Sequence, residues 1–150
     1  MRFVCDSMVG RLAKWLRILG FDCAYCRSGK KAELLRLSLN EGRTVLTRDG
    51  SFVRRYPDKS FLVKGEELKT QLMQVIRDLR LHSDVSPFSR CAVCNTPLVR
   101  KSKADAKGKV PFFVYQSHEE FVYCPSCDRY YWEGSHHRAI LERLAELGVK

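Results

Sequence analysis

Two pairs of closely spaced cysteines are the residues of this 150-residue chain best placed to do chemistry. Cys91 and Cys94 form one pair, Cys124 and Cys127 form the other, and the 29 residues from 95 to 123 separate them. Four thiolates suit the tetrahedral coordination of structural zinc, and a gap of two residues is its usual ligand spacing. The alternatives are two disulfides or four unrelated buried thiols. We predict one structural zinc ion held by the four cysteines.

Two acids, Asp6 and Asp49, each follow a short apolar run. Open α/β sheets bind ligands beyond the carboxyl ends of their strands, so both carboxylates meet at one edge if residues 2–5 and 44–47 form neighbouring strands. Paired carboxylates suit Mg²⁺ or Mn²⁺, which can activate water and stabilise charge on a phosphodiester. Each Asp taken singly is also a typical helix N-cap or turn residue, and that alternative stays open.

The charge of the chain indicates the kind of partner. It has 27 Lys and Arg against 17 Asp and Glu, a formal net charge of +10, which favours a polyanion and most simply a nucleic acid. Ordinary solubility charge is the alternative. Lys14, Arg17 and Arg48 lie near the two acids, and we predict that they contact phosphate. A solvated helix face is the competing interpretation for Lys14.

The first 80 residues alternate between strand and helix patterns. Runs at 2–5, 21–26, 44–47 and 60–63 are typical of short strands, and apolar residues recur with helical spacing over 8–19, around 34–39 and over 66–80. This βαβαβ alternation predicts an α/β fold with a parallel sheet covered by helices.

A polar linker at 82–90 ends the alternation of strand and helix patterns, and short β-rich runs follow it. We therefore predict one domain over 1–85 and a second over 86–150. Short β-rich runs at 110–115, 121–123 and 129–132 lie between the cysteine turns, as in a zinc ribbon, and residues 139–147 predict a closing helix. So small a module buries little core, and a bound metal would stabilise it. The basic segment 101–109 is expected to be a mobile loop.

Cysteine usage and hydropathy indicate a cytoplasmic location with reduced thiols. Seven cysteines do not form a closed disulfide framework, the first residues show no signal-peptide pattern, and no apolar stretch approaches the ~18 residues of a membrane span. A third pair, Cys23 and Cys26, lies within a predicted strand and is better explained as buried core than as a redox motif.

Four segments together resemble one family. They are DSMVGRLAKWLRILGFD at 6–22, EGRTVLTRD at 41–49, CAVCNTPL at 91–98 and CPSCDRYYWEGSH at 124–136. In this order they resemble the Mut-seven C-terminal ribonuclease domains, which are PIN-like nuclease folds carrying a zinc ribbon. The resemblance spans nearly the whole chain.

The resemblance implies a metal-dependent ribonuclease that uses Mg²⁺ or Mn²⁺ on an acidic site, with RNA as substrate and the ribbon helping to bind it. Asp6 and Asp49 match the acidic positions of the family, and Asp22 matches another recurring acid. Lys31 departs from the pattern, because it stands where the family tends to place an acid. The alternatives are a catalytically inactive RNA-binding adaptor with a structural zinc, and a DNA-binding zinc-ribbon regulator, which would leave Asp6 and Asp49 unused.

Overall fold

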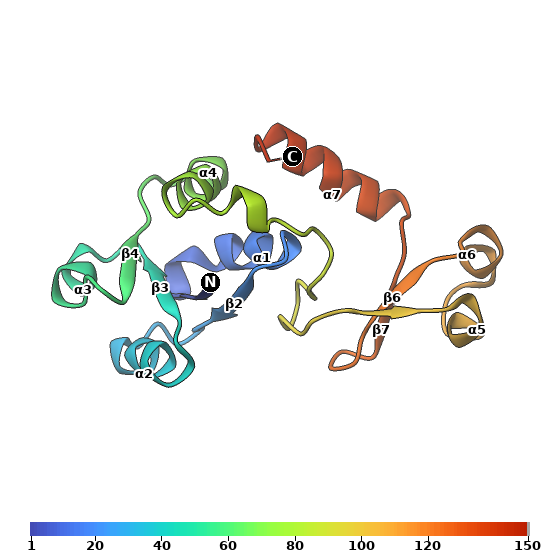
Figure 1. Cartoon of the computed structure of the whole chain (residues 1–150), viewed down its shortest axis with the longest axis horizontal. Coiled ribbons are helices and arrows are strands. Elements are labelled where there is room, and N and C mark those ends of the chain that lie inside the picture. The colour runs from blue at the N-terminus through green and yellow to red at the C-terminus, as the bar shows by residue number, and fades with distance from the viewer. Residues whose placement is uncertain (150) are drawn as a thin grey trace. The chain divides into compact units, whose positions relative to one another are not determined.

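The computed structural model, which describes residues 1–149, contains a parallel sheet and a smaller antiparallel sheet (Figure 1). A 3-10 turn at Ser7–Val9 precedes the first helix. The strands and helices of the first part are, in chain order, β1 (Arg2–Cys5), α1 (Gly10–Ile18), β2 (Asp22–Tyr25), α2 (Lys31–Glu41), β3 (Thr44–Thr47), α3 (Gly50–Arg55), β4 (Ser60–Leu62) and α4 (Leu68–Asp78).

The first sheet has the order β2-β1-β3-β4, and all its pairings are parallel. Arg2 lies opposite Asp22 at the start of β1 and β2, whereas Cys5 lies opposite Leu46 near the ends of β1 and β3. The predicted parallel α/β sheet is therefore confirmed, and β1 and β3 are direct neighbours. Residues that follow these two strands share one edge of the sheet.

Helices cover both faces of this sheet. Successive side chains of β1 point to opposite faces, and Val4 packs with Leu34 of α2 and Phe52 of α3 in one buried cluster. Helices α1 and α4 pack against each other and bury Leu12 and Leu72 (Figure 1). Burial on both faces explains why the strands read as nearly continuous apolar runs.

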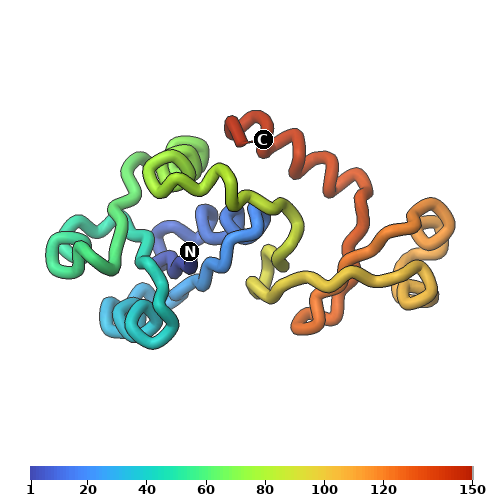
Figure 2. Tube along the Cα trace, viewed as in Figure 1, coloured from blue at the N-terminus to red at the C-terminus, as the bar shows by residue number. Residues whose placement is uncertain are grey.

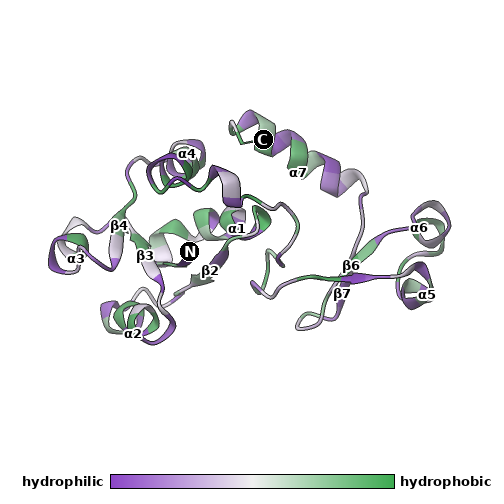
Figure 3. Cartoon of the chain, viewed as in Figure 1, coloured by the Kyte–Doolittle hydropathy of each residue, from purple (hydrophilic) through white to green (hydrophobic). Residues whose placement is uncertain are grey.

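The second sheet has the order β5-β6-β7 and is antiparallel. Figure 2 traces the chain through it, and Figure 3 shows apolar residues on β6 and polar residues on β7. The elements of this part are β5 (Val99–Lys101), α5 (Lys103–Ala106), α6 (Phe112–Ser117), β6 (Phe121–Cys124), β7 (Arg129–Tyr131) and α7 (Ser135–Glu146). The chain divides into two compact units, Met1–Asn95 and a second that begins at Thr96. The proposed boundary at 85 and 86 remains a prediction.

Two local predictions were wrong. Residues 110–115 form no strand, because α6 begins after Pro111 and buries Val114 with Ala106 and Phe121. Burial of that side chain outweighs the β propensity of the aromatic and branched residues. The basic segment 101–109 contains α5, which begins with a capping box between Ser102 and Asp105. No helix of residues 1–149 is long and apolar enough to cross a bilayer.

Candidate functional site

The four cysteines of the two pairs form one cluster. The Sγ atoms of Cys91, Cys94, Cys124 and Cys127 lie within 4.8 Å of one another. Zinc–sulfur bonds of ~2.3 Å in a tetrahedron place the sulfurs ~3.8 Å apart, so the cluster has the size that a zinc ion requires. Neither two disulfides nor four unrelated thiols would require all four sulfurs to meet. The residues therefore fit a closed structural zinc site.

The turns that carry these cysteines have the same backbone feature. The residue after each pair, Asn95 or Asp128, has a positive φ of 72° or 52°. Asn and Asp tolerate the left-handed conformation better than other non-glycine residues, because their short polar side chains bond locally. In the first turn the Asn95 amide donates to the Cys91 carbonyl at 2.9 Å. In the second, the Cys127 amide donates to the Cys124 sulfur at 3.4 Å.

The first cysteine turn is fixed to the parallel sheet by Arg17 and Asn95. Arg17 on α1 donates to the carbonyls of Cys23, at 2.7 Å, and Val93, at 2.9 Å. The Asn95 side chain accepts from the Cys23 amide at 3.0 Å and donates to Asp22 at 2.7 Å. The guanidinium of Arg17, which the sequence suggested as a phosphate contact, thus binds main-chain oxygens of the same unit.

Asp22 lies at the start of β2 and is surrounded by donors. Its carboxylate is 2.7 Å from Arg43, 3.1 Å from Arg2 and 3.8 Å from Arg90. Burial alone would raise the pKa of Asp22, but hydrogen bonds from Arg43, Asn95 and Arg2 outweigh it and lower the pKa to about 2. The structure does not bring Asp22 to the end of the sheet that Asp6 follows.

Asp6 follows β1 and is almost fully buried, with 6% of its surface exposed. One carboxylate oxygen caps the 3-10 turn by accepting from the Met8 amide at 2.9 Å. The other accepts a hydrogen bond from the Thr47 hydroxyl. The N-cap interpretation of Asp6 is therefore confirmed. A role at the edge of the sheet remains a prediction, and a capping carboxylate retains further lone pairs for it.

Asp49 follows β3 and caps α3, a helix that the sequence reading missed. Its Oδ1 accepts from the Ser51 amide at 3.0 Å and the Ser51 hydroxyl at 2.6 Å, and its Oδ2 lies 3.2 Å from the Lys31 ammonium. The hydrogen bond from the Ser51 hydroxyl and the contact with Lys31 lower the pKa of Asp49 to about 2. The carboxylate is thus strongly held as an anion and is already paired with a cation.

Thr47 joins the two acids and was missed by sequence reasoning. Its hydroxyl donates to Asp6 and accepts from the Asp49 amide at 3.0 Å, and its side chain is buried. The only signal in the sequence was its place as the last residue of the strand before Arg48 and Asp49. One hydroxyl thus links the residues that follow β1 and β3.

Arg48 and Lys14 are the other side chains predicted to contact phosphate. Arg48 is half-buried between Thr47 and Asp49, and Lys14 is exposed on α1. Cys23 and Cys26 of the third pair are both buried, which confirms their interpretation as core. 

The fold and these two sites define a class: a parallel α/β domain with carboxylates at its edge, followed by a cluster of four cysteines that could hold a metal ion. The Mut7-C RNAse domain model matches residues 1–144, and the chain therefore belongs to that family. This membership supports a ribonuclease-like function with RNA as the substrate. The comparisons found no similar curated protein and no similar solved structure.

Proposed function

We propose that the protein is a metal-dependent ribonuclease that hydrolyses RNA phosphodiester bonds at the Asp6–Thr47–Asp49 edge of the parallel sheet. The observation that carries this proposal is the Thr47 hydroxyl, which bonds to Asp6 and to the Asp49 amide. It links the Asp6 carboxylate to the main chain of Asp49. These two residues follow neighbouring parallel strands, the place where open α/β sheets bind ligands.

The donor set suits Mg²⁺ or Mn²⁺. These ions favour carboxylate oxygens and are commonly bound by one or two carboxylates together with substrate phosphates. Asp6 and Asp49 would hold the ion, which when bound supplies a nucleophilic water and stabilises charge on the phosphate. The hydrogen bonds from Met8 and Thr47 fix the orientation of the Asp6 carboxylate before substrate arrives. Arg48 and Lys14 would contact RNA phosphates beside the edge.

Asp22 and Arg17 have structural roles in this proposal. Asp22 neutralises the guanidinium groups at the strand starts, and Arg17 holds the first cysteine turn against β2. The zinc would be structural, because four cysteine ligands leave no open coordination position. The ribbon would assist the reaction by binding RNA.

One observation favours a second function, an RNA-binding adaptor without catalysis. The Lys31 ammonium lies 3.2 Å from Asp49, where it occupies a carboxylate oxygen that a metal ion would use. If the ion does not displace Lys31, the chain would retain its basic surface and its zinc ribbon but would lack hydrolysis.

Cleavage of labelled RNA with Mg²⁺ or Mn²⁺ tests the proposal. Asp6→Asn and Asp49→Asn each remove a charge but keep a good helix-capping side chain, so the fold should persist. We expect each variant to lower the cleavage rate by at least ~100-fold. Losing one contact that stabilises the transition state by about 3 kcal/mol has an effect of this size. Asp58→Asn, an exposed site with the same chemical change, should leave the rate unaltered.

Two results would contradict the ribonuclease. Equal cleavage by the wild type and both variants would show that the reaction occurs elsewhere. Absence of cleavage by the wild type, together with RNA binding that weakens as salt rises, would establish the adaptor instead.

A further inference from the structure

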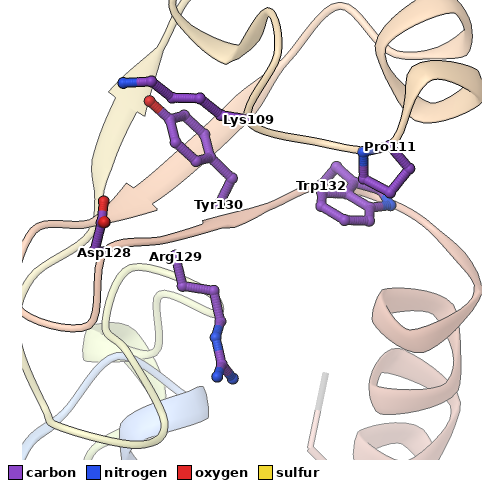
Figure 4. A pocket seen from close by; sticks show the side chains of 6 residues that line it. All are labelled: Lys109, Pro111, Asp128, Arg129, Tyr130 and Trp132. Carbon is purple, nitrogen blue, oxygen red and sulfur yellow. The ribbon is translucent and has the colours of Figure 1, made fainter.

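The antiparallel sheet carries a surface pocket that no step of the proposed hydrolysis uses. The pocket has a volume of ≈ 440 Å³ and lies entirely within the unit that begins at Thr96. This volume falls in the range of small-ligand sites, ~300–1,000 Å³. Figure 4 shows its lining, which is Lys109, Pro111, Asp128, Arg129, Tyr130 and Trp132.

Two aromatic rings of the pocket are held in place by the protein. Tyr130 and Trp132 are two residues apart and pack against the buried cluster around Phe121. The Tyr130 hydroxyl donates to the Asp105 carbonyl at 3.3 Å. A Cβ on Gly134 would lie 2.9 Å from the indole nitrogen of Trp132, so the backbone approaches this ring as closely as a glycine permits. Rings ordered in advance lose little entropy when a flat ligand stacks on them.

One cation lies over one of these rings, and a second lines the pocket. The Lys109 ammonium lies 6.0 Å from the centre of the Tyr130 ring, and Arg129 also lines the pocket. Segment 99–109 has five Lys or Arg and one Asp. The one acid of the lining, Asp128, accepts a hydrogen bond from the Tyr123 hydroxyl at 2.7 Å. The pocket therefore offers aromatic faces and positive charge together, the combination that binds a base and its phosphate.

We propose that this pocket binds one unpaired nucleotide of RNA and so makes the ribbon select single-stranded RNA over duplex. The base stacks on Tyr130 or Trp132, and Lys109 and Arg129 contact the neighbouring phosphates. A base within a duplex is already stacked and cannot enter the pocket, whereas an unpaired base can. This inference rests on RNA as the substrate in the proposed function and adds which form of RNA the ribbon takes.

The test is binding, measured on the zinc-loaded full chain without Mg²⁺ or Mn²⁺ so that hydrolysis does not contribute. Fluorescence anisotropy compares a labelled single-stranded RNA with the same strand in a perfect duplex. We expect the single strand to bind at least ~10-fold more tightly, and Trp132→Leu to weaken its binding by about 5- to 150-fold, because a base stack contributes ~1–3 kcal/mol. Phe113→Leu, at a phenylalanine that is 71% exposed outside the pocket, should bind as the wild type does.

A charge comparison tests the phosphate contacts. Lys109→Gln should weaken RNA binding. It should also reduce the steepness of the plot of log binding constant against log salt concentration by ~0.7, the value for one phosphate contact on a single strand. Lys107→Gln makes the same charge change two residues away, outside the lining, and should have the smaller effect.

Tryptophan fluorescence provides a readout that does not depend on how well Trp132→Leu folds. In a Trp15→Phe protein the only tryptophan is Trp132, and stacking should quench its emission at the RNA concentrations that saturate anisotropy. The inference fails if emission is unchanged at saturation, if the duplex binds as tightly as the single strand, or if Lys107→Gln and Lys109→Gln act alike. These results are independent of the cleavage assay, so failure of either proposal can be recognised by itself.

Discussion

The two candidate metal centres differ in how much of their geometry exists without a metal. At the edge of the parallel sheet, Asp6 and Asp49 are fixed by helix caps and by Thr47, and the sheet beneath them is buried on both faces. In the unit from Thr96 onward, one buried cluster contains only Ala106, Val114 and Phe121. From this difference we expect that a zinc ion held by the cysteines would be part of the fold of the ribbon. An ion at the carboxylate edge would instead serve function on a structure already formed.

Zinc removal should produce the largest effect and separates the two centres directly. Structural zinc sites contribute ~10–16 kcal/mol to folding of small domains. A strong chelator, or Cys124→Ser, should therefore abolish amide protection in β6 and β7 while β1 and β3 stay protected. Hydrogen exchange measured by mass spectrometry checks this. Parallel loss of protection in β1 would show that the sheet also depends on the metal, and the comparison would fail.

Asp22→Asn should have the next largest effect, on stability. The substitution removes one of the two carboxylates that contact Arg43, whose side chain is 6% exposed, and leaves it only that of Glu41 at 3.0 Å. We expect a loss of about 2–3 kcal/mol in the free energy of unfolding, below the ~3–5 kcal/mol for a fully buried pair because Asp22 retains some exposure. Urea denaturation measures the loss, with Asp58→Asn as the exposed control.

The pH dependence of this loss has a defined sign. Because the folded-state pKa of Asp22 is lowered to about 2, its stabilisation is complete above its ordinary pKa of ~3.9 and disappears as pH falls toward the folded value. The stability gap between the wild type and Asp22→Asn should therefore be constant from pH 7 to 5 and should shrink below pH 4. A gap that widens in acid would contradict the assigned ion pairs.

Lys31→Ala should give the smallest effect, on metal affinity at the carboxylate edge. An exposed ion pair contributes ~0.2–1 kcal/mol, so its removal should tighten Mn²⁺ binding by about 1.4- to 5-fold. Titration calorimetry with Mn²⁺ measures this on the zinc-loaded protein. Lys30→Ala removes the same charge from the adjacent exposed position and should change the affinity less. Equal effects of the two variants would mean that only general charge, and no direct contact with Asp49, is involved.

Local patterns were sufficient to predict the four parallel strands and three of the four α-helices of the first unit, and to single out the four cysteines that the structure brings together. The strand runs, the helical spacing of leucines and the cysteine pairs are each signals within a few residues. Predictions failed where packing outweighed propensity, as at 110–115, where α6 buries Val114 in the ribbon cluster. Helix α3 was missed because its cap, Asp49, was considered chiefly as a ligand.

The sequence by itself determined which residues could do chemistry, because residue type and short spacing set what a thiolate pair or a carboxylate can bind. Only the tertiary structure decided which partner each one has. Thr47 reaches Asp6 from 41 residues away, and Asn95 reaches Asp22 from 73 residues away. Asp6, Asp22 and Asp49 look alike in the sequence, yet the order of the parallel strands places arginines around Asp22 and a shared threonine between the other two. A hydrogen bond depends on distance in space, and strand order, which no local pattern encodes, sets that distance.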